Sequence, residues 1–158
     1  MERIAIFPGS FDPFTIGHES IVKRALPLFD QIIIAVGTNT NKSDFFPIEK
    51  RIKWINEVFE SEEKISVQSY KGLTIDFCKQ VNAKYIIRGL RTSSDFEYER
   101  AIGQMNKAMD VSIETIFLLT EPEHSAVNST IVRDIIRHGG DASKFLPNSR
   151  DLKNYKID

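Results

Sequence analysis

One run near the start of the chain combines residue types that can bind a phosphate group. Gly9 lets the backbone approach a ligand closely, and Ser10 offers both a hydroxyl and a backbone N–H. Gly17 and His18 are expected in the first turn of a helix, where free N–H groups and the helix dipole favour an anion. The run predicts a phosphate cradle that is neither a Walker A loop nor a GxGxxG loop. It reads Pro8-Gly9-Ser10-Phe11-Asp12-Pro13-Phe14-Thr15-Ile16-Gly17-His18.

Basic residues and hydroxyls recur farther along the chain. Arg88 and Arg91 flank Gly89 just past an expected strand, where a guanidinium suits bidentate capture of phosphate. Residues 124–130 read His-Ser-Ala-Val-Asn-Ser-Thr ahead of a helical pattern, so hydroxyls and free N–H groups could form a second anion cradle there. Lys42 follows the second expected strand. Taken one at a time, these features fit solvated loops or a plain helix cap equally well.

These residues need a scaffold that brings them together, and the hydrophobic pattern predicts one. Runs of β-branched residues favour strands buried on both faces, as in a parallel sheet. Strands alternate with helices, which predicts a single-domain α/β fold with a Rossmann-like, doubly wound parallel sheet of about five strands and flanking helices. Ligands bind beyond the carboxyl ends of such strands. The expected strands are 3–7, 31–36, 65–70, 85–87 and 115–119, and the expected helices are 17–26, one from Pro47 onward, 73–81, 96–109, 129–138 and a short one after Pro147.

Composition excludes several other classes of protein. The chain has 158 residues, of which 41% are hydrophobic, and this suits one globular domain. A formal charge of -1 argues against bulk affinity for nucleic acid or an anionic membrane, so an RNA-binding protein fits poorly. The single cysteine, Cys78, cannot form an internal disulfide and favours a reducing cytoplasm. Residues 1–7 are not expected to form a signal peptide, and no apolar stretch is long enough to span a bilayer.

Several motifs, in order, resemble one enzyme family. The first run is similar to the signature of nucleotidyltransferases with an HxGH or TxGH motif, and Thr15-x-Gly17-His18 has the TxGH form typical of the bacterial phosphopantetheine adenylyltransferase family. Residues 87–91, Ile-Arg-Gly-Leu-Arg, resemble a second motif of that family. Residues 124–133 resemble the I-S-S-T/S-x-V-R/K motif of the superfamily, but Asn128 stands where serine is usual. The resemblance extends from about residue 3 to residue 147.

The resemblance implies a reaction. The adenylyl group of ATP would pass to 4'-phosphopantetheine by direct in-line attack, giving dephospho-coenzyme A and pyrophosphate with the help of Mg²⁺. No protein nucleophile is needed, because a phosphate oxygen is already anionic at neutral pH. The same resemblance implies a cytoplasmic homohexamer that acts in coenzyme A biosynthesis.

The resemblance also assigns roles to residues. His18, Lys42 and Arg91 would be catalytic, and His18 would stabilise charge that develops on the α-phosphate. The acceptor would contact Ser10, Lys42, Thr74 and Arg88. ATP would contact Ser10, Phe11, His18, Gly89, Leu90, Arg91, Glu99, His124, Ser125, Ala126, Val127, Asn128, Ser129 and Thr130, with Glu99 on the ribose or adenine side.

Alternatives remain open at this point. A related adenylyl- or cytidylyltransferase could use another phosphate acceptor, such as nicotinate mononucleotide or choline phosphate, although those enzymes more often show HxGH. A regulatory module could bind a nucleotide without turnover. Asp12 could serve a turn or lie near magnesium, Thr74 could simply open a helix, and the sequence does not fix any metal ligand.

Overall fold

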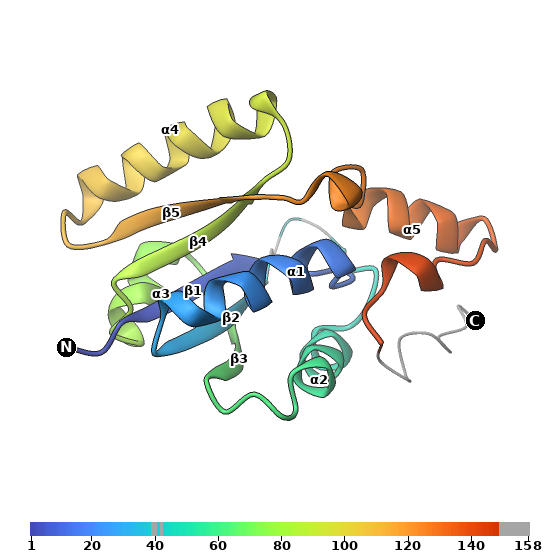
Figure 1. Cartoon of the computed structure of the whole chain (residues 1–158), viewed down its shortest axis with the longest axis horizontal. Helices are drawn as coiled ribbons and strands as arrows, with labels where there is room; N and C mark the ends of the chain where they lie inside the picture. Colours follow the sequence, from blue (N-terminus) through green and yellow to red (C-terminus); the bar gives the residue numbers. More distant parts are fainter. Residues whose placement is uncertain (39–40, 42, 149–158) are drawn as a thin grey trace.

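The computed structural model describes residues 1–38, 41 and 43–148, and its centre is one sheet of five parallel strands (Figure 1). The strand order is β3-β2-β1-β4-β5, and every neighbouring pair is parallel. This confirms the predicted doubly wound α/β fold. The order reverses between β1 and β4, which is where such sheets bind ligands. The strands are β1 (Ile4–Gly9), β2 (Gln31–Gly37), β3 (Ile65–Tyr70), β4 (Tyr85–Leu90) and β5 (Glu114–Leu119).

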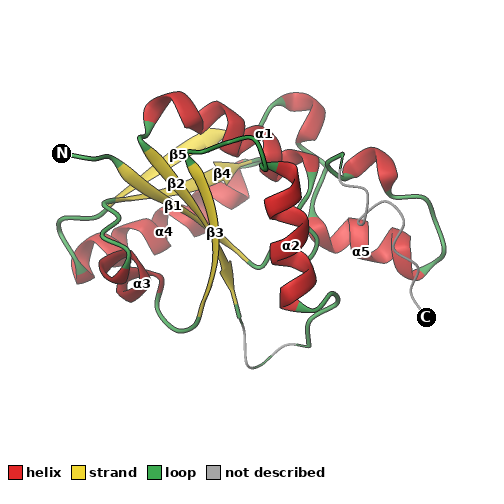
Figure 2. Cartoon of the chain, turned by 90° about the horizontal axis from the view of Figure 1, so that it is seen from below, coloured by secondary structure: helices red, strands yellow, loops and turns green. Residues whose placement is uncertain are grey.

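Helices cover both faces of this sheet (Figure 2). One face packs against α1 and α2, and the other packs against α3, with α4 lying over β4 and β5 on that same side. The fifth helix, α5, lies beyond the carboxyl ends of the strands (Figure 1). The α-helices are α1 (Ile16–Ala25), α2 (Ile48–Val58), α3 (Thr74–Gln80), α4 (Ser93–Met109) and α5 (Ser129–Arg137), and the short 3-10 turns are η1 (Leu26–Leu28), η2 (Pro122–His124) and η3 (Ser143–Phe145).

The interior strand β2 shows how the sheet is buried on both faces. Ile32 and Ile34 point into the core beneath α1 and α2, whereas Ile33 and Ala35 point into the core on the α3 side. Successive side chains of a strand alternate between faces, so a continuous apolar run fills both cores at once. A third, smaller core joins α2, α5 and the segment around Leu146, and it holds α5 in place.

Three predicted boundaries were wrong in ways that matter for the site. The first strand was expected to end at residue 7 but continues through Pro8 to Gly9, and both residues line the cavities. The fourth strand was expected to end at residue 87 but continues through Arg88 to Leu90, so Arg88 lies within β4 and only Arg91 follows it. The fourth helix was expected to begin at residue 96 but begins at Ser93, because the Thr92 side chain accepts a hydrogen bond from the Asp95 N–H and caps it. The short helix expected after Pro147 falls largely outside the described residues.

In the part of the chain that the structure describes, no helix combines the length and apolar character needed to cross a bilayer.

Candidate active site

Two cavities meet at the carboxyl ends of β1 and β4. The larger cavity, about 560 Å³, lies between the ends of β1 to β4 and helices α3 and α4. The smaller cavity, about 300 Å³, lies between the start of α1, the end of β4 and the start of α5. Both are lined by Pro8, Gly9, Ser10, Arg88 and Glu99. A ligand in one cavity therefore lies directly beside a ligand in the other.

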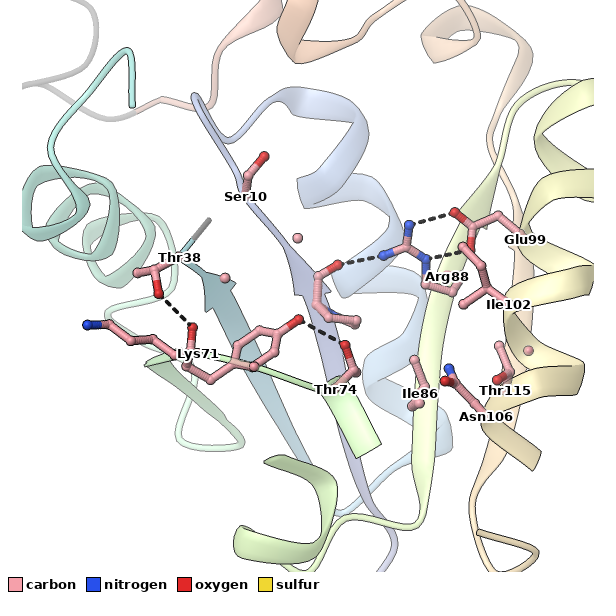
Figure 3. Close-up of a pocket in the computed structure, with 16 residues that line it drawn as sticks. Ser10, Thr38, Lys71, Thr74, Ile86, Arg88, Glu99, Ile102, Asn106 and Thr115 are labelled. Carbon is pink, nitrogen blue, oxygen red and sulfur yellow. Dashed lines mark hydrogen bonds and ion pairs between the residues drawn. The ribbon is translucent and has the colours of Figure 1, made fainter. Parts of the chain in front are cut away.

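An ion pair forms the shared wall of the two cavities (Figure 3). The Arg88 guanidinium donates from Nε and Nη2 to the two carboxylate oxygens of Glu99, at 2.8 and 2.6 Å, and from Nη1 to the Pro8 carbonyl at 2.8 Å. Glu99 is only 8% exposed. This pairing offsets the cost of placing a charged side chain inside a strand and joins α4 to β4 and β1.

Polar side chains surround the larger cavity (Figure 3). The Tyr70 hydroxyl and Thr74 Oγ1 lie 3.1 Å apart and form a hydrogen bond, and the Thr38 hydroxyl donates to the Tyr70 carbonyl. Asn106 and Thr115 approach from α4 and β5. Thr74 was predicted from the sequence, but Tyr70 and Asn106 were missed. Tyr70 ends β3, so the rule that ligands bind at strand carboxyl ends could have found it; nothing in the sequence singled out Asn106.

The smaller cavity is built around the start of α1. Thr15 is the N-cap residue, and its Oγ1 accepts a hydrogen bond from the His18 N–H. In return, His18 Nδ1 accepts from the Thr15 N–H at 3.0 Å. This is a capping box in which histidine takes the place usually held by Glu or Gln. Because Nδ1 is committed as an acceptor, the neutral imidazole carries its proton on Nε2.

The surroundings of His18 keep its ring uncharged. Burial lowers the pKa of His18 to about 3, and the nearby charges of Arg88 and Arg91 lower it in the same direction. The rings of Phe11 and Phe14 lie 5.0 and 5.3 Å from the imidazole, between centroids. His18 can therefore donate a hydrogen bond from Nε2 without bringing a positive charge.

The turn that carries Ser10 is tightly shaped. Phe11 is 3% exposed and has a φ of 48°, in the left-handed region that side chains rarely adopt. A Cβ on Gly9 would lie 2.9 Å from the Phe11 ring, so only glycine fits beneath it. Phe11 lines the smaller cavity, yet most of its ring is in the core.

The start of α5 closes the smaller cavity. Asn128 is its N-cap, and the side-chain oxygen accepts from the Ile131 N–H at 2.8 Å. The Ser129 hydroxyl donates to the Pro13 carbonyl at 2.8 Å and joins α5 to the first turn. Asparagine thus preserves the cap at the position where serine is usual, and it leaves the Ser129 N–H within the first helical turn, where anions are favoured.

The remaining predicted residues lie at varying distances from the cleft. Gly89, Arg91 and Val127 line the smaller cavity, and Arg91 Nε bonds the Asp95 carboxylate at 3.1 Å. The sequence-predicted contacts that do not line either cavity are Leu90, His124, Ser125, Ala126 and Thr130. Lys42 lies outside the described residues, so its predicted role stays a prediction.

The described carboxylates do not form a ready metal site in the cleft. Glu99 and Asp95 are paired with arginines, and Asp12 accepts backbone N–H groups from Phe45 and Phe46 at 2.7 and 2.9 Å. Asp12 therefore serves the local chain geometry. A cluster of two glutamates and a histidine at η2, Glu121, Glu123 and His124, has side chains close enough to share a cation, but it lines neither cavity.

Comparisons with known proteins place this site in a family. Residues 6–135 match the family model described as cytidylyltransferase-like. The phosphopantetheine adenylyltransferase of Flavobacterium psychrophilum is 53% identical over 151 residues, which cover 96% of this chain and 99% of that protein. The enzyme of the same name from Leptospira biflexa is 49% identical over 147 residues, covering 93% and 92% of the two chains. The chain belongs to the phosphopantetheine adenylyltransferase family.

Solved structures of other nucleotide enzymes share the fold of this family. A bifunctional NMN adenylyltransferase/ADP ribose pyrophosphatase from Francisella tularensis, complexed with AMP and a manganese ion, aligns with a TM-score of 0.72 at 17% identity. The alignment covers 98% of this chain and 48% of that one. A lipopolysaccharide core biosynthesis protein from Thermoplasma volcanium aligns with a TM-score of 0.57 at 16% identity, over 77% and 99% of the chains. These likenesses show the fold, and family membership rests on the closer relatives.

The neutral His18 of this family member predicts a pH-dependent stability. The unfolded chain binds a proton at the ordinary pKa of 6.5, whereas folded His18 resists protonation down to about 3. Stability is therefore complete above pH 6.5 and falls as the pH drops from 6.5 toward 3. Between pH 7.5 and pH 5, the free energy of unfolding of the wild type should therefore fall. His18→Gln retains a capping-box acceptor but does not titrate, so its fall should be smaller by on the order of 1–2 kcal/mol. Urea denaturation at both pH values measures this difference, and equal losses in the two proteins would contradict a neutral His18.

Proposed function

We propose that this chain transfers the adenylyl group of ATP to 4'-phosphopantetheine and releases pyrophosphate, a step of coenzyme A biosynthesis. The observation that carries the proposal is the meeting of two cavities at Ser10 and Arg88. ATP occupies the smaller cavity, which is bounded by the starts of α1 and α5. The acceptor occupies the larger one. Family membership supports the same pair of substrates.

The proposed chemistry uses position and charge. An oxygen of the acceptor phosphate attacks the α-phosphorus of ATP. The bond between that phosphorus and the oxygen that bridges the α- and β-phosphates breaks. Pyrophosphate leaves with the electron pair, so no protein group becomes covalently attached. Holding both phosphates at one junction supplies orientation, and donors already in place stabilise the charge of the transition state.

Each protein group has a defined part in this proposal. His18 donates from Nε2 to an α-phosphate oxygen as negative charge builds up there. Arg88 binds the acceptor phosphate through the donors that Glu99 and Pro8 leave open, and Arg91 binds phosphates of ATP. Lys42 reaches the phosphates of both substrates. Ser10 bridges the two substrates. The N–H groups at the starts of α1 and α5 face the triphosphate.

Magnesium enters this proposal with its nucleotide. The cleft carboxylates are already engaged, so the ion would arrive as MgATP and be held by phosphate oxygens. The ion would neutralise part of the phosphate charge, and the arginines would neutralise more of it. ATP and a phosphorylated intermediate of coenzyme A synthesis are substrates of the cytoplasm, and we propose that compartment for the chain.

The reaction is tested by measuring pyrophosphate release from MgATP with a panel of acceptors. We expect release with 4'-phosphopantetheine and none with nicotinate mononucleotide or choline phosphate. His18→Ala should lower single-turnover rates by about 10²- to 10³-fold while ATP binding changes little, because its hydrogen bond strengthens only in the transition state. ATP binding without release for any acceptor would indicate a regulatory module, and release with another acceptor would identify a different transferase.

Arg88 is expected to govern the acceptor. Arg88→Ala should raise the acceptor KM by about 10- to 100-fold, because a charge-assisted contact is lost. The single variant also leaves Glu99 buried without its partner. The double variant Arg88→Ala with Glu99→Gln removes that complication and serves as the control. Steady-state kinetics at saturating ATP measure the effect, and an acceptor KM within twofold of wild type in the double variant would refute the role.

We also propose that the chain assembles into a homohexamer through the outer face of α4. Tyr98, Met105 and Met109 follow one another at spacings of seven and four residues, and they are 70%, 64% and 50% exposed. A stripe of large apolar side chains on one helix face is typical of a surface that is buried against a partner.

Changing the middle of this stripe should break the assembly. Met105→Glu is expected to shift the protein to a smaller species, because a charge would have to be buried at the interface. Light scattering coupled to size-exclusion chromatography measures the mass. Leu28→Glu, a similar change at an exposed apolar residue of η1, is the control and should leave the assembly intact. A monomeric wild type, or a Met105→Glu protein of unchanged mass, would contradict the proposal.

A further inference from the structure

A buried arginine lies beneath the site without lining either cavity. Arg51, on α2, is 1% exposed and is among the largest fully buried side chains of the described residues. Its Nε donates to the Phe46 carbonyl at 3.0 Å, and its Nη1 donates to the Ser10 carbonyl. Its Nη2 lies 2.9 Å from the carboxylate of Asp44. A buried guanidinium is costly unless its donors are engaged. The two carbonyl hydrogen bonds and the ion pair with Asp44 offset that cost, although Nη2 itself makes no hydrogen bond with the described residues.

The contact with Ser10 fixes the direction of a peptide group. In a trans peptide the C=O and the next N–H point in opposite directions. Because the Ser10 carbonyl is turned inward to Arg51, the Phe11 N–H is turned away from α2, and both residues line the smaller cavity. Phe11 holds the left-handed φ of 48°, a conformation that needs such an external restraint.

Asp12 also restrains this turn, through its carboxylate and through its backbone carbonyl. Its carboxylate accepts from the N–H groups of Phe45 and Phe46, and the Phe46 carbonyl in turn accepts from Arg51. The backbone carbonyl of Asp12 accepts from Arg133 Nη1 of α5 at 2.8 Å. The turn is thus tied to α2, to the segment around Phe46 and to α5.

We propose that Arg51 is a positioning residue for the nucleotide, acting through the Ser10 carbonyl. It holds the peptide between Ser10 and Phe11 so that the Phe11 N–H faces the phosphates of ATP. This inference rests on the proposed ATP site but not on the identity of the acceptor. Asp44 contributes mainly to the stability of the buried charge, since its contact is with Nη2 and not with the turn.

A purely structural role for Arg51 makes a different prediction. If Arg51 only stabilised the fold, its replacement would lower the melting temperature and would weaken the binding of both substrates to the same degree. A positioning role predicts a selective loss on the nucleotide side, because Phe11 lines the smaller cavity and not the larger one.

The test compares Arg51→Met, Arg51→Lys and Asp44→Asn in the full chain. Calorimetry measures the Kd of MgATP without acceptor, kinetics measure the acceptor KM, and thermal unfolding reports the fold. Arg51→Met is expected to raise the Kd of MgATP about 10- to 100-fold, while the acceptor KM stays within about twofold of wild type. Arg51→Lys keeps the charge but not the paired carbonyl contacts, so we expect an intermediate loss. Asp44→Asn should bind ATP within about twofold of wild type. Arg3→Met removes an arginine that pairs with Asp30 on the surface and is the matched control.

Each outcome decides the proposal. An Arg51→Met protein with wild-type ATP affinity overturns it, and so does an equal loss of ATP and acceptor binding. If Arg51→Met does not fold, Arg51→Lys is compared with Asp44→Asn: a loss of ATP affinity confined to Arg51→Lys supports positioning, and equal affinities overturn it. A wild type that binds ATP but uses another acceptor contradicts only the proposed function, whereas a wild type that does not bind ATP overturns both.

Discussion

The ion pair between Arg88 and Glu99 is the interaction on which the cleft depends. A parallel strand buried on both faces has no room for an unpaired charge, yet β4 carries an arginine between Ile87 and Gly89. Glu99 neutralises it, and the Pro8 carbonyl takes a further donor. The pair therefore joins three elements and forms the wall that separates the two cavities. Because Glu99 is buried, the loss of Arg88 would leave its carboxylate without a partner in a site poorly accessible to water, which destabilises the fold.

Burial, and to a smaller degree the nearby charges, explains the uncharged state of His18. Two arginines lie close enough to lower its pKa, and burial lowers that pKa further than either of them. A protonated imidazole would add a third cation before any phosphate arrived. The capping box instead fixes a neutral ring with its proton on Nε2, and Thr15 provides this by holding Nδ1. Folding of the helix start and the chemistry of the ring are thus set by the same two residues.

Much of the scaffold could be predicted from the sequence, and the failures have physical causes. The run in β2 was located to within a residue, because burial on both faces leaves a continuous apolar signal. The edge strand β3 was also located correctly, although it alternates apolar and polar residues and is only partly buried. The end of β4 was missed because that signal stops at Arg88, whose partner Glu99 lies eleven residues away on another element. Arg51 looks like an ordinary polar residue of an amphipathic helix, and the carbonyls that justify its burial leave no mark in the sequence. The helix α4 was predicted, but the sequence does not tell that several of its large apolar side chains, Tyr98, Met105 and Met109 among them, are exposed.

The fold alone does not choose an acceptor, since structures with quite different printed activities share it. The choice has to come from the larger cavity. Its described walls offer hydroxyls and an amide, from Thr74, Asn106 and Thr115, beside apolar surface, with Arg88 at the inner end. The aromatic ring in that lining, Tyr70, is already stacked on Phe77 with centroids 4.9 Å apart, so it has one face less for a nucleobase or pyridine ring. A phosphate on a long, uncharged, amide-bearing arm matches these walls better than a second nucleotide does, because the amides find hydrogen-bond partners and the phosphate reaches the junction. Selectivity for the acceptor would then reside in α3, α4 and the end of β3. The turn around Ser10 and Phe11, which we propose binds the nucleotide, would not determine it.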